Sequence, residues 1–324
     1  MNNQATATIV TDSVSKYGIR VTTFQLRYWR PIHSELMTHR VFSRNAGSSR
    51  ARPSKAIIEQ VRTEPWGPIH WGKNQSGMQA HEELNKQNII DVKYCWASAA
   101  ARAAEHADTM SKIGVHKQIV NRLLEPFTYI DVLVTATDYN NWFALRNHPD
   151  AQPEIAQLAQ LMLVEYQSSL PTLLQGGQWH LPYITEADWK EAERFCQIGR
   201  ITRDMPKYKE KLEIVRKISV ARCARVSYKA FDGTVAPIEK DLKLFEDLLV
   251  SEPLHASPAE HQATPDEMQW IQMIAVASPE DYENGDDDED VLDTSEKWCS
   301  PEFHGNFRGW KQYRKMLPNE FVPG

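Results

Sequence analysis

The amino-terminal part of the chain is rich in β-branched residues, which favour strands. Two such stretches lie close together, Thr6–Val10 and Ile19–Leu26, and we predict a strand at each of them. Pro31 ends this pattern, and the segment from Glu35 to Arg52 that follows is polar and basic. The chain therefore begins with predicted sheet and continues into a region rich in hydrogen-bond donors.

From about residue 80 to residue 250 the apolar positions recur mainly at helical spacing. The strongest helical signals cover Glu82–Gly114, Ala151–Leu174 and Ile238–Val250, where apolar side chains stand three and four positions apart. The apolar stretch Tyr129–Val134 lies between the first two and is predicted as a strand. These patterns predict an α+β fold with a helical majority.

Composition and hydropathy place the chain among packed soluble proteins. It has 324 residues, of which 41% are hydrophobic and 25% charged, enough to bury a core. The mean hydropathy is -0.54, and the lack of an apolar run of about 18 residues excludes a membrane-spanning helix. No basic stretch leading into an apolar one opens the chain, so we expect a cytoplasmic protein.

Cysteine usage and charge narrow the possible ligands. The four cysteines lie far apart without a C-x-x-C pair, which favours reduced thiols, and no metal site is predicted. Residues 280–293 carry nine acidic side chains and no basic one, as a solvated acidic loop does. They account for the net charge of -6, because the rest of the chain carries +3. That balance suits small anionic ligands better than nucleic acid.

The densest polar constellation is Thr38–Arg50, which has three arginines, three serines, one histidine and one asparagine in thirteen residues. Guanidinium groups, hydroxyls and backbone N–H groups are the donors that phosphate oxygens need. The segment is therefore interpreted as an anion site, with a solvated basic loop as the alternative.

A second constellation is Asn141–Ile155. Its prolines predict a helix that begins near Ala151, with Asp150 as N-cap and Pro153 in the first turn. Arg146 would then lie just before the helix, either as a partly buried cation aimed into a pocket or as a surface arginine.

The third constellation, His255–His261, has two histidines six positions apart, which is a poor metal-binding spacing on a helix. Ala224–Tyr228 precedes it in the chain and is predicted as a strand or turn. No G-x-G-x-x-G or P-loop motif occurs, so a dinucleotide site of the Rossmann type is unsupported.

Taken together, the three constellations resemble the flavin-dependent thymidylate synthases, the ThyX family. The family signature R-H-R-x-x-S-x-N-E-x-S-x-R-Y is met at His39, Arg40, Ser43, Asn45, Ser48 and Arg50. The stretch N-F-L-x-L-R-x-x-x-x-A-Q-x-E-I is met at Asn141, Leu145, Arg146, Ala151, Gln152, Glu154 and Ile155. The segments R-x-x-L-P, A-R-V-S and H-x-S-P-F-E-H are similar to Arg122–Pro126, Ala224–Ser227 and His255–His261.

The resemblance implies a circularly permuted chain, because A-R-V-S and H-x-S-P-F-E-H come first in the family and last here. It also implies helices packed on a mainly antiparallel sheet, with a mostly helical middle. We expect one ThyX-like catalytic domain over residues 1–265, with uncovered insertions near 62–80 and 176–217. A C-terminal extension over 266–324 would contain the acidic loop 280–293.

The resemblance implies an activity as well. It is the FAD-dependent transfer of a one-carbon unit from methylenetetrahydrofolate to C5 of dUMP, reduced with NADPH to give dTMP. Such an enzyme is a flavin-dependent methyltransferase, and we expect a homotetramer with active sites shared between subunits. Its partner would be a small nucleotide, with no membrane or nucleic acid expected.

The site roles that the resemblance implies fall into three groups. FAD would be contacted by His39, Arg40, Asn45, Asn141, His255, Ser257 and Glu260. The nucleotide would be bound by Glu35, Ser48, Ser49, Arg50 and, from a neighbouring subunit, Arg122. Arg146 would be the catalytic residue, a fixed cation that faces a carbonyl oxygen of the pyrimidine.

Several positions depart from the family pattern. Thr38 replaces the first Arg of R-H-R, so that guanidinium would have to come from Arg44 or Arg27. Further replacements are Glu35 for Gln, Ala46 for Glu and Asp150 for a common His. They motivate a second hypothesis, a related C5 hydroxymethylase that acts on dUMP or dCMP. A non-catalytic module that binds nucleotides or nucleic acid is the third.

Overall fold

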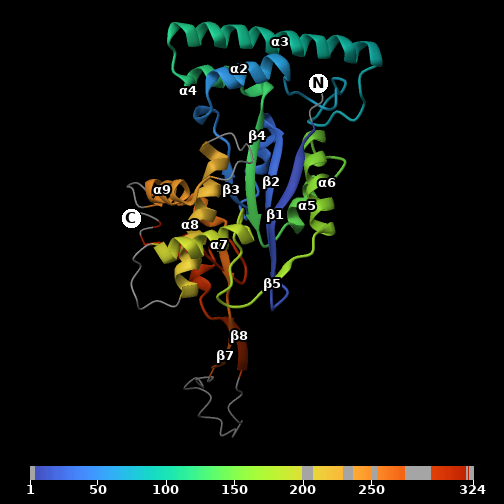
Figure 1. The fold of residues 1–324 in the computed structure, drawn as a ribbon. Helices are drawn as coiled ribbons and strands as arrows, with labels where there is room; N and C mark the ends of the chain where they lie inside the picture. Colours follow the sequence, from blue (N-terminus) through green and yellow to red (C-terminus); the bar gives the residue numbers. More distant parts are fainter. Residues whose placement is uncertain are drawn as a thin grey trace, which may run out of the picture.

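A five-stranded sheet forms the centre of the fold, with its strands in the order β3-β4-β2-β1-β5 (Figure 1). The strands are β1 (Thr6–Ser15), β2 (Arg20–Trp29), β3 (Ser43–Ala46), β4 (Tyr129–Ala136) and β5 (Thr172–Leu174). Neighbouring strands run antiparallel, except that β1 and β5 are parallel. The prediction of an α+β fold with a mainly antiparallel sheet is confirmed.

The computed structural model describes residues 4–198, 207–228, 236–249, 254–273, 293–318 and 320. Residues 280–292, which make up nearly all of the predicted acidic loop, lie outside the described residues. Within the described part, no helix is both long and apolar enough to cross a membrane.

One face of the sheet packs against α5 (Asn140–Arg146) and α6 (Pro153–Ser168) (Figure 1). Alternate residues of a strand point to the same face, and helical residues three or four apart share a side. The buried core accordingly includes Phe24, Leu26 and Tyr28 of β2, and Ile155, Leu158 and Met162 of α6. This core fixes the position of α5, which ends at Arg146.

The opposite face of the sheet is covered by α8 (Lys207–Tyr228), which is flanked by α7 (Glu186–Ile198) and α9 (Ile238–Leu249). The predicted strand or turn at Ala224–Tyr228 is wrong, because these residues are the last turns of α8. Val226 suggested extended chain, but here it is buried against β4 as part of one helical face. Packing therefore outweighs the local strand propensity.

A helical layer caps one end of the sheet (Figure 1). It contains α2 (Ser54–Thr63), α3 (Lys86–Ile113) and α4 (Lys117–Val120). The predicted helix Glu82–Gly114 is confirmed with a later start, because Asn85 is the N-cap and its side chain accepts a hydrogen bond from Asn88 N. Gly114 ends the helix with a φ of 97°, which favours glycine.

Both predicted ends of α6 are wrong. The N-cap is Gln152, whose side chain makes no cap hydrogen bond, in place of Asp150, and Pro153 is the first helical residue. The helix ends at Ser168 rather than at Leu174. Pro171 follows closely and favours extended backbone before it, so the chain continues into β5.

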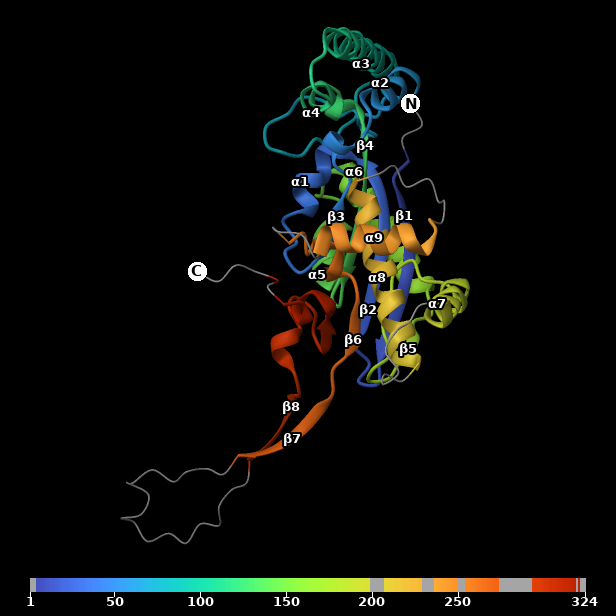
Figure 2. The same ribbon diagram turned by 60° about the vertical axis from the view of Figure 1, so that its left-hand side comes forward.

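The carboxyl-terminal segments pair among themselves. Strand β6 (Ala263–Pro265) pairs with β9 (Trp310–Gln312), and β7 (Met268–Met273) pairs with β8 (Asp293–Trp298). Figure 2 shows the β7–β8 hairpin projecting from the body. Phe307 and Trp310 are buried against Val21 of β2, so these aromatic side chains are core. The domain boundary after residue 265 stays a prediction.

Candidate functional site

Three segments that are far apart in the sequence meet beside β3. The strand itself belongs to the Thr38–Arg50 constellation, and it contacts both α8 and the 3-10 turn Ser257–Glu260, which also contact each other. Asn45 Nδ2 donates to the carbonyl oxygen of Cys223 across 3.3 Å. The fold therefore brings the first and third constellations into one place.

Arg146 is held by three side chains from the chain segment after β2, which includes α1 (His33–Leu36). Its Nε donates to His39 Nε2 at 3.1 Å, and its Nη1 donates to Glu35 Oε2 at 2.9 Å. A longer bond of 3.3 Å joins Nη2 to Thr38 Oγ1. Only 21% of the Arg146 side chain is exposed, so it is a partly buried cation rather than a surface arginine.

The imidazole of His39 is neutral in this arrangement. Its Nε2 accepts the hydrogen bond from Arg146, so that nitrogen carries no proton. Burial and the nearby Arg146 charge both lower the pKa of His39. The second constellation is thus joined to the first by a hydrogen bond between a fixed cation and a neutral ring.

Arg146 lies in the wall of a cavity of about 700 Å³. Glu35 and Trp29 line the same cavity, together with residues from the chain segments 68–81 and 149–154. A volume in this range accommodates a small-molecule ligand. The cavity places a carboxylate acceptor and a guanidinium donor at the same opening.

Neither arginine that could replace the missing guanidinium at position 38 does so. Arg44 Nη1 donates to the carbonyl oxygens of Met37 and His39, at 3.0 and 3.1 Å. Arg27 makes a two-bond ion pair with Asp131, at 2.7 and 3.2 Å. Arg44 thus stabilises the loop that carries Thr38, while Arg27 belongs to the sheet.

Two of the side chains expected to bind a phosphate, those of Ser49 and Arg122, meet at Glu125. Ser49 Oγ donates to Glu125 Oε1 at 2.5 Å, and Arg122 Nη1 donates to the same oxygen at 3.0 Å. Arg30 lies 3.9 Å from this carboxylate. Arg50 is exposed and Ser48 partly buried on the adjoining turn. Sequence reasoning missed Arg30, which belongs to no motif that it used, and the acceptor role of Glu125, which lies inside the segment Arg122–Pro126 but was given no role there.

The carboxyl-terminal segment reaches into the same region. Gln312 Nε2 donates to Ser43 Oγ at 3.0 Å and to the carbonyl oxygen of Glu260 at 2.9 Å. The Glu260 carboxylate forms an ion pair with Arg314. No sequence signal pointed to Gln312 or Arg314, because their partners lie far away along the chain. These contacts join the carboxyl-terminal segment to β3 and to the turn Ser257–Glu260.

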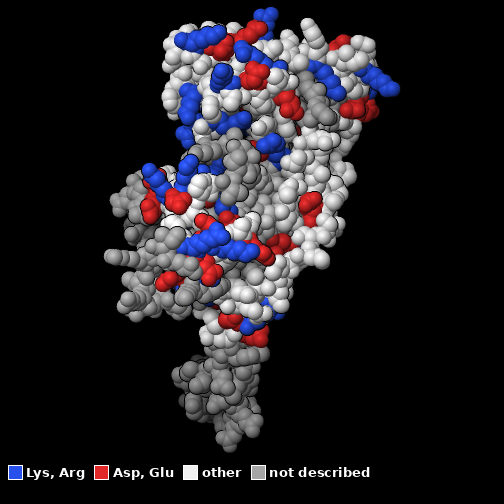
Figure 3. All heavy atoms as spheres, in the orientation of Figure 1, with Lys and Arg blue, Asp and Glu red and all other residues white. Residues whose placement is uncertain are grey.

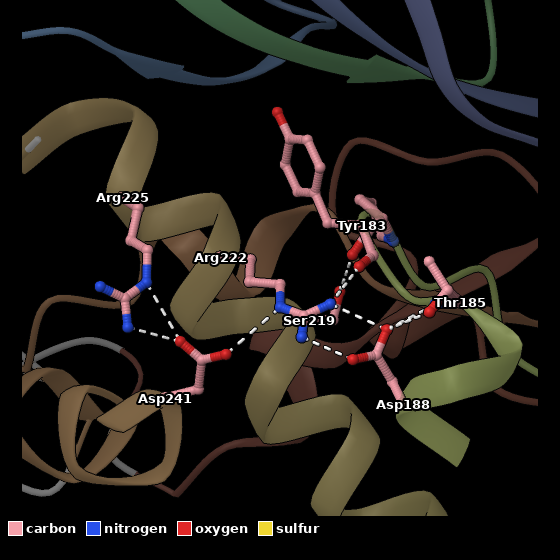
Figure 4. Close-up of polar contacts among 8 residues, drawn as sticks. Tyr183, Thr185, Asp188, Ser219, Arg222, Arg225 and Asp241 are labelled. Carbon is pink, nitrogen blue, oxygen red and sulfur yellow. Dashed lines mark hydrogen bonds and ion pairs between the residues drawn. The ribbon is translucent and has the colours of Figure 1, made fainter. Parts of the chain in front are cut away.

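Two arginines of α8, Arg222 and Arg225, form a buried ion network (Figure 4). Arg222 donates to Asp188 of α7 at 2.6 and 2.9 Å and to Asp241 of α9 at 3.2 Å. Arg225 donates to the other oxygen of Asp241 at 2.5 Å. Burial opposes ionisation of Asp188, but hydrogen bonds from Arg222 and Thr185 outweigh it and lower its pKa. The network therefore holds α8 against α7 and α9.

The remaining candidates are solvent-exposed: Arg40, Asn141, His255 and Ser257. Next to Glu260, the buried atoms His261 Nε2 and Gln262 Oε1 have no hydrogen-bond partner among the described residues. Cys223 is fully buried, and burial raises the pKa of its thiol well above its usual range, which excludes a thiolate nucleophile. Within the described part, no group of His, Cys, Asp and Glu could hold a metal ion.

One protein family is similar to part of the chain. Residues 19–172 match the family Thy1, thymidylate synthase complementing protein. This match contains the Thr38–Arg50 constellation and Arg146, and the fold around them is the predicted one. Over these residues the chain is similar to that family, as its sequence motifs predicted. The enzyme class that this similarity indicates is a thymidylate synthase-like methyltransferase.

Two solved structures are similar to part of the chain. They are crystal structures of a UMP/dUMP methylase PolB from Streptomyces cacaoi, bound with 5-Br UMP and with 5-Br dUMP. Each is 16% identical and covers 51% of this chain, and the alignments span 89% and 90% of theirs, with TM-scores of 0.40 and 0.41. None of the curated proteins matches the chain.

Proposed function

We propose that the protein transfers a one-carbon unit to C5 of dUMP and reduces it to a methyl group, giving dTMP. Methylenetetrahydrofolate would supply the carbon, NADPH the electrons, and FAD would carry them. The observation that carries the proposal is Arg146, fixed by His39 and Glu35 in the wall of a ligand-sized cavity. It lies within the residues that match the thymidylate synthase family.

Arg146 would act on the pyrimidine by electrostatics. A guanidinium held near a ring carbonyl stabilises negative charge on that oxygen as electron density moves, and C5 then becomes a better nucleophile. His39, Glu35 and Thr38 each accept one N–H of the guanidinium, so one N–H on each Nη is left for a substrate oxygen. A neutral His39 adds no second positive charge at this position.

FAD, when bound, would supply the redox chemistry, and the residues around β3 fit it. Arg40, Asn141, His255 and Ser257 are exposed donors on the segments that meet there or on α5. The unpaired buried atoms of His261 and Gln262 are typical of the wall of a polar ligand site. His39, Asn45 and Glu260 would line the site, with their side chains oriented by Arg146, Cys223 and Arg314.

The nucleotide phosphate would bind at Ser48, Ser49, Arg50 and Arg122. Ser49 and Arg122 already converge on Glu125 within one chain. A phosphate dianion and this carboxylate repel each other, so binding would need either an arginine from outside or rotation of Glu125 away from Ser49. This supports our proposal of a homotetramer in which a neighbouring subunit contributes an Arg122; light scattering of the active protein tests it.

The proposed location is the cytoplasm. All four cysteines lie within the described residues and are unpaired, as a reducing compartment allows.

The proposed reaction is tested by the mass of the product. Purified protein loaded with FAD is given dUMP, methylenetetrahydrofolate and NADPH, and we expect a gain of one methyl group on the base. A gain of hydroxymethyl, or a reaction with dCMP alone, would overturn the assignment.

Arg146→Ala tests the role of the guanidinium. We expect turnover to fall by about 100-fold, the usual cost of losing one transition-state donor, and FAD affinity to fall far less, because only the hydrogen bond that orients His39 is lost. Arg194→Ala is the matched control, because Arg194 is an exposed arginine on α7, paired with Glu191. Unchanged turnover in Arg146→Ala would show that Arg146 does not act on the substrate.

A further inference from the structure

Residues 68–84 form a small hairpin beside the Arg146 cavity, here termed the flap. Gly72 and Glu83 form an isolated antiparallel bridge. Lys73 N donates to the Glu82 carbonyl at 2.7 Å, and Leu84 N donates to the Trp71 carbonyl at 2.9 Å. The two arms of the flap are therefore paired with each other and not with the central sheet.

Aromatic packing anchors the root of the flap. The ring of Trp96 on α3 meets Trp71 edge-on at 6.1 Å between centroids, and it meets Trp29 of β2 at 5.9 Å. Trp96 Nε1 donates to the carbonyl oxygen of Trp66 at 2.9 Å. Three tryptophans from separate elements therefore hold the point at which the flap leaves the body.

Two hydrogen bonds join the flap to the start of α6 and to the turn before it. Near the root, Ile69 N donates to Glu154 Oε1 at 2.9 Å, and the Glu154 side chain is buried. Near the tip, Gln79 Nε2 donates to the carbonyl oxygen of Asp150 at 3.0 Å. Gln79 is exposed, so a single bond near the surface closes this side of the cavity.

The cavity lies between the flap and Arg146. The flap contributes to its lining Pro68, His70, Gly72, Met78, Gln79, Ala80 and His81. The charged groups that line it are one cation, Arg146, and three carboxylates, Glu35, Asp150 and Glu154. That balance repels a phosphate but suits a neutral ring with an N–H donor for Glu35 and a carbonyl acceptor for Arg146.

Trp29 connects this cavity to the phosphate-binding candidates. Its ring lines the cavity, and its Nε1 donates to the carbonyl oxygen of Pro126 at 2.8 Å, next to Glu125. The acidic cavity and the cluster of Ser49 and Arg122 therefore adjoin the same tryptophan. A pyrimidine nucleotide matches this arrangement, because its neutral base suits the acidic cavity and its phosphate suits the cluster of Ser49 and Arg122.

We propose that the flap is the outer wall of the pyrimidine pocket and that Gln79 holds it closed over the base. The flap thereby determines how tightly the ring is held against Arg146, whereas the phosphate is bound independently of it. This inference rests on the proposed function, because it takes the occupant to be the base of dUMP.

Gln79→Ala tests the proposal through equilibrium binding of two probes. Calorimetry with dUMP should show a 5- to 10-fold weaker affinity than the wild type, the cost of about one hydrogen bond. Deoxyribose 5-phosphate lacks the base, and its affinity should be unchanged. In turnover assays the KM for dUMP should rise by a similar factor while kcat stays within about twofold.

Asn74→Ala is the matched control. Asn74 is an exposed polar residue of the same flap and does not line the cavity. Its dUMP affinity should equal that of the wild type. Equal weakening for both probes in Gln79→Ala, or for neither, would overturn the role of the flap. Failure of the wild type to bind dUMP would instead refute the proposed function.

Discussion

At the scale of single residues, burial determines which histidines could act as acids or bases and which only support the fold. His180 and His261 are fully buried and belong to a chain of hydrogen bonds. Thr23 bonds His180 Nε2 at 2.8 Å, Thr135 bonds His261 Nδ1 at 2.8 Å, and the two hydroxyls lie 2.7 Å apart. Burial lowers the pKa of both imidazoles to about 3. They are therefore neutral core groups and not acids or bases.

Their burial makes folding stability depend on pH. The unfolded chain binds protons at these histidines below about pH 6.5, whereas the folded protein does so only near pH 3. Stability is therefore lost as pH falls through 6.5, by about 1.4 kcal/mol per pH unit for each histidine. We expect urea unfolding to show a loss of roughly 3 kcal/mol between pH 6.5 and pH 5 from this pair, because the full slope is reached only below pH 6.5.

The variant His261→Gln should halve that pH slope whatever its effect on absolute stability. His106→Gln is the control, since His106 is exposed on α3. A slope that is identical in all three proteins would show that the buried imidazoles do not carry the effect.

At the scale of elements, the sequence predicted those parts of the fold that carry a long regular pattern. Strands β1, β2 and β4 and helices α3, α6 and α9 follow from β-branched runs and from apolar spacing. The end of α8 was missed because the five residues Ala224–Tyr228 hold too short a pattern to show a period. Arg146 and His39 were found through local motifs, whereas Arg30, Arg314 and the acceptor role of Glu125 were not. Their roles come from contacts between distant segments, which no local pattern records.

The buried ion network around Asp241 should contribute strongly to the free energy of unfolding, because it joins α8 to α9. Asp241 is fully buried and is shared by Arg222 and Arg225. Asp241→Ala would leave both guanidinium groups without their shared partner, and we expect a loss of about 3–5 kcal/mol in the free energy of unfolding. Glu246→Ala, an exposed acid on the same helix, should change it by less than about 0.5 kcal/mol. Equal free energies of unfolding for the two variants would contradict this role of the buried ion network.

At the scale of the whole molecule, charge of both signs is mixed on the face shown in Figure 3. Lys and Arg side chains gather there over the helical layer of α2 and α3, with Asp and Glu between them. The positive charge that the proposed chemistry needs is instead supplied by single arginines whose positions are fixed. Arg146 and Arg122 are each held by a neighbouring carboxylate.

The carboxyl-terminal segment should be needed for the fold. A chain that ends at Cys299 loses the buried Phe307 and Trp310, and Ser43 loses its bond from Gln312. We expect its melting temperature to fall by roughly 10 °C or more, because each buried aromatic side chain contributes several kcal/mol. A chain that ends at Glu320 should melt like the full protein. Equal melting of the two would show that the segment is dispensable.

The contact between β4 and α8 has a consequence for synthesis on the ribosome. Leu133 is covered by Cys223 and Val226, which are translated about 90 residues later. At 5–20 residues per second, that apolar face of the nascent sheet stays uncovered for roughly 5–20 s. During this interval the emerging chain offers a hydrophobic strand surface to chaperones. The site beside β3 is therefore completed only late in translation, when α8 and the turn at Ser257–Glu260 have left the exit tunnel.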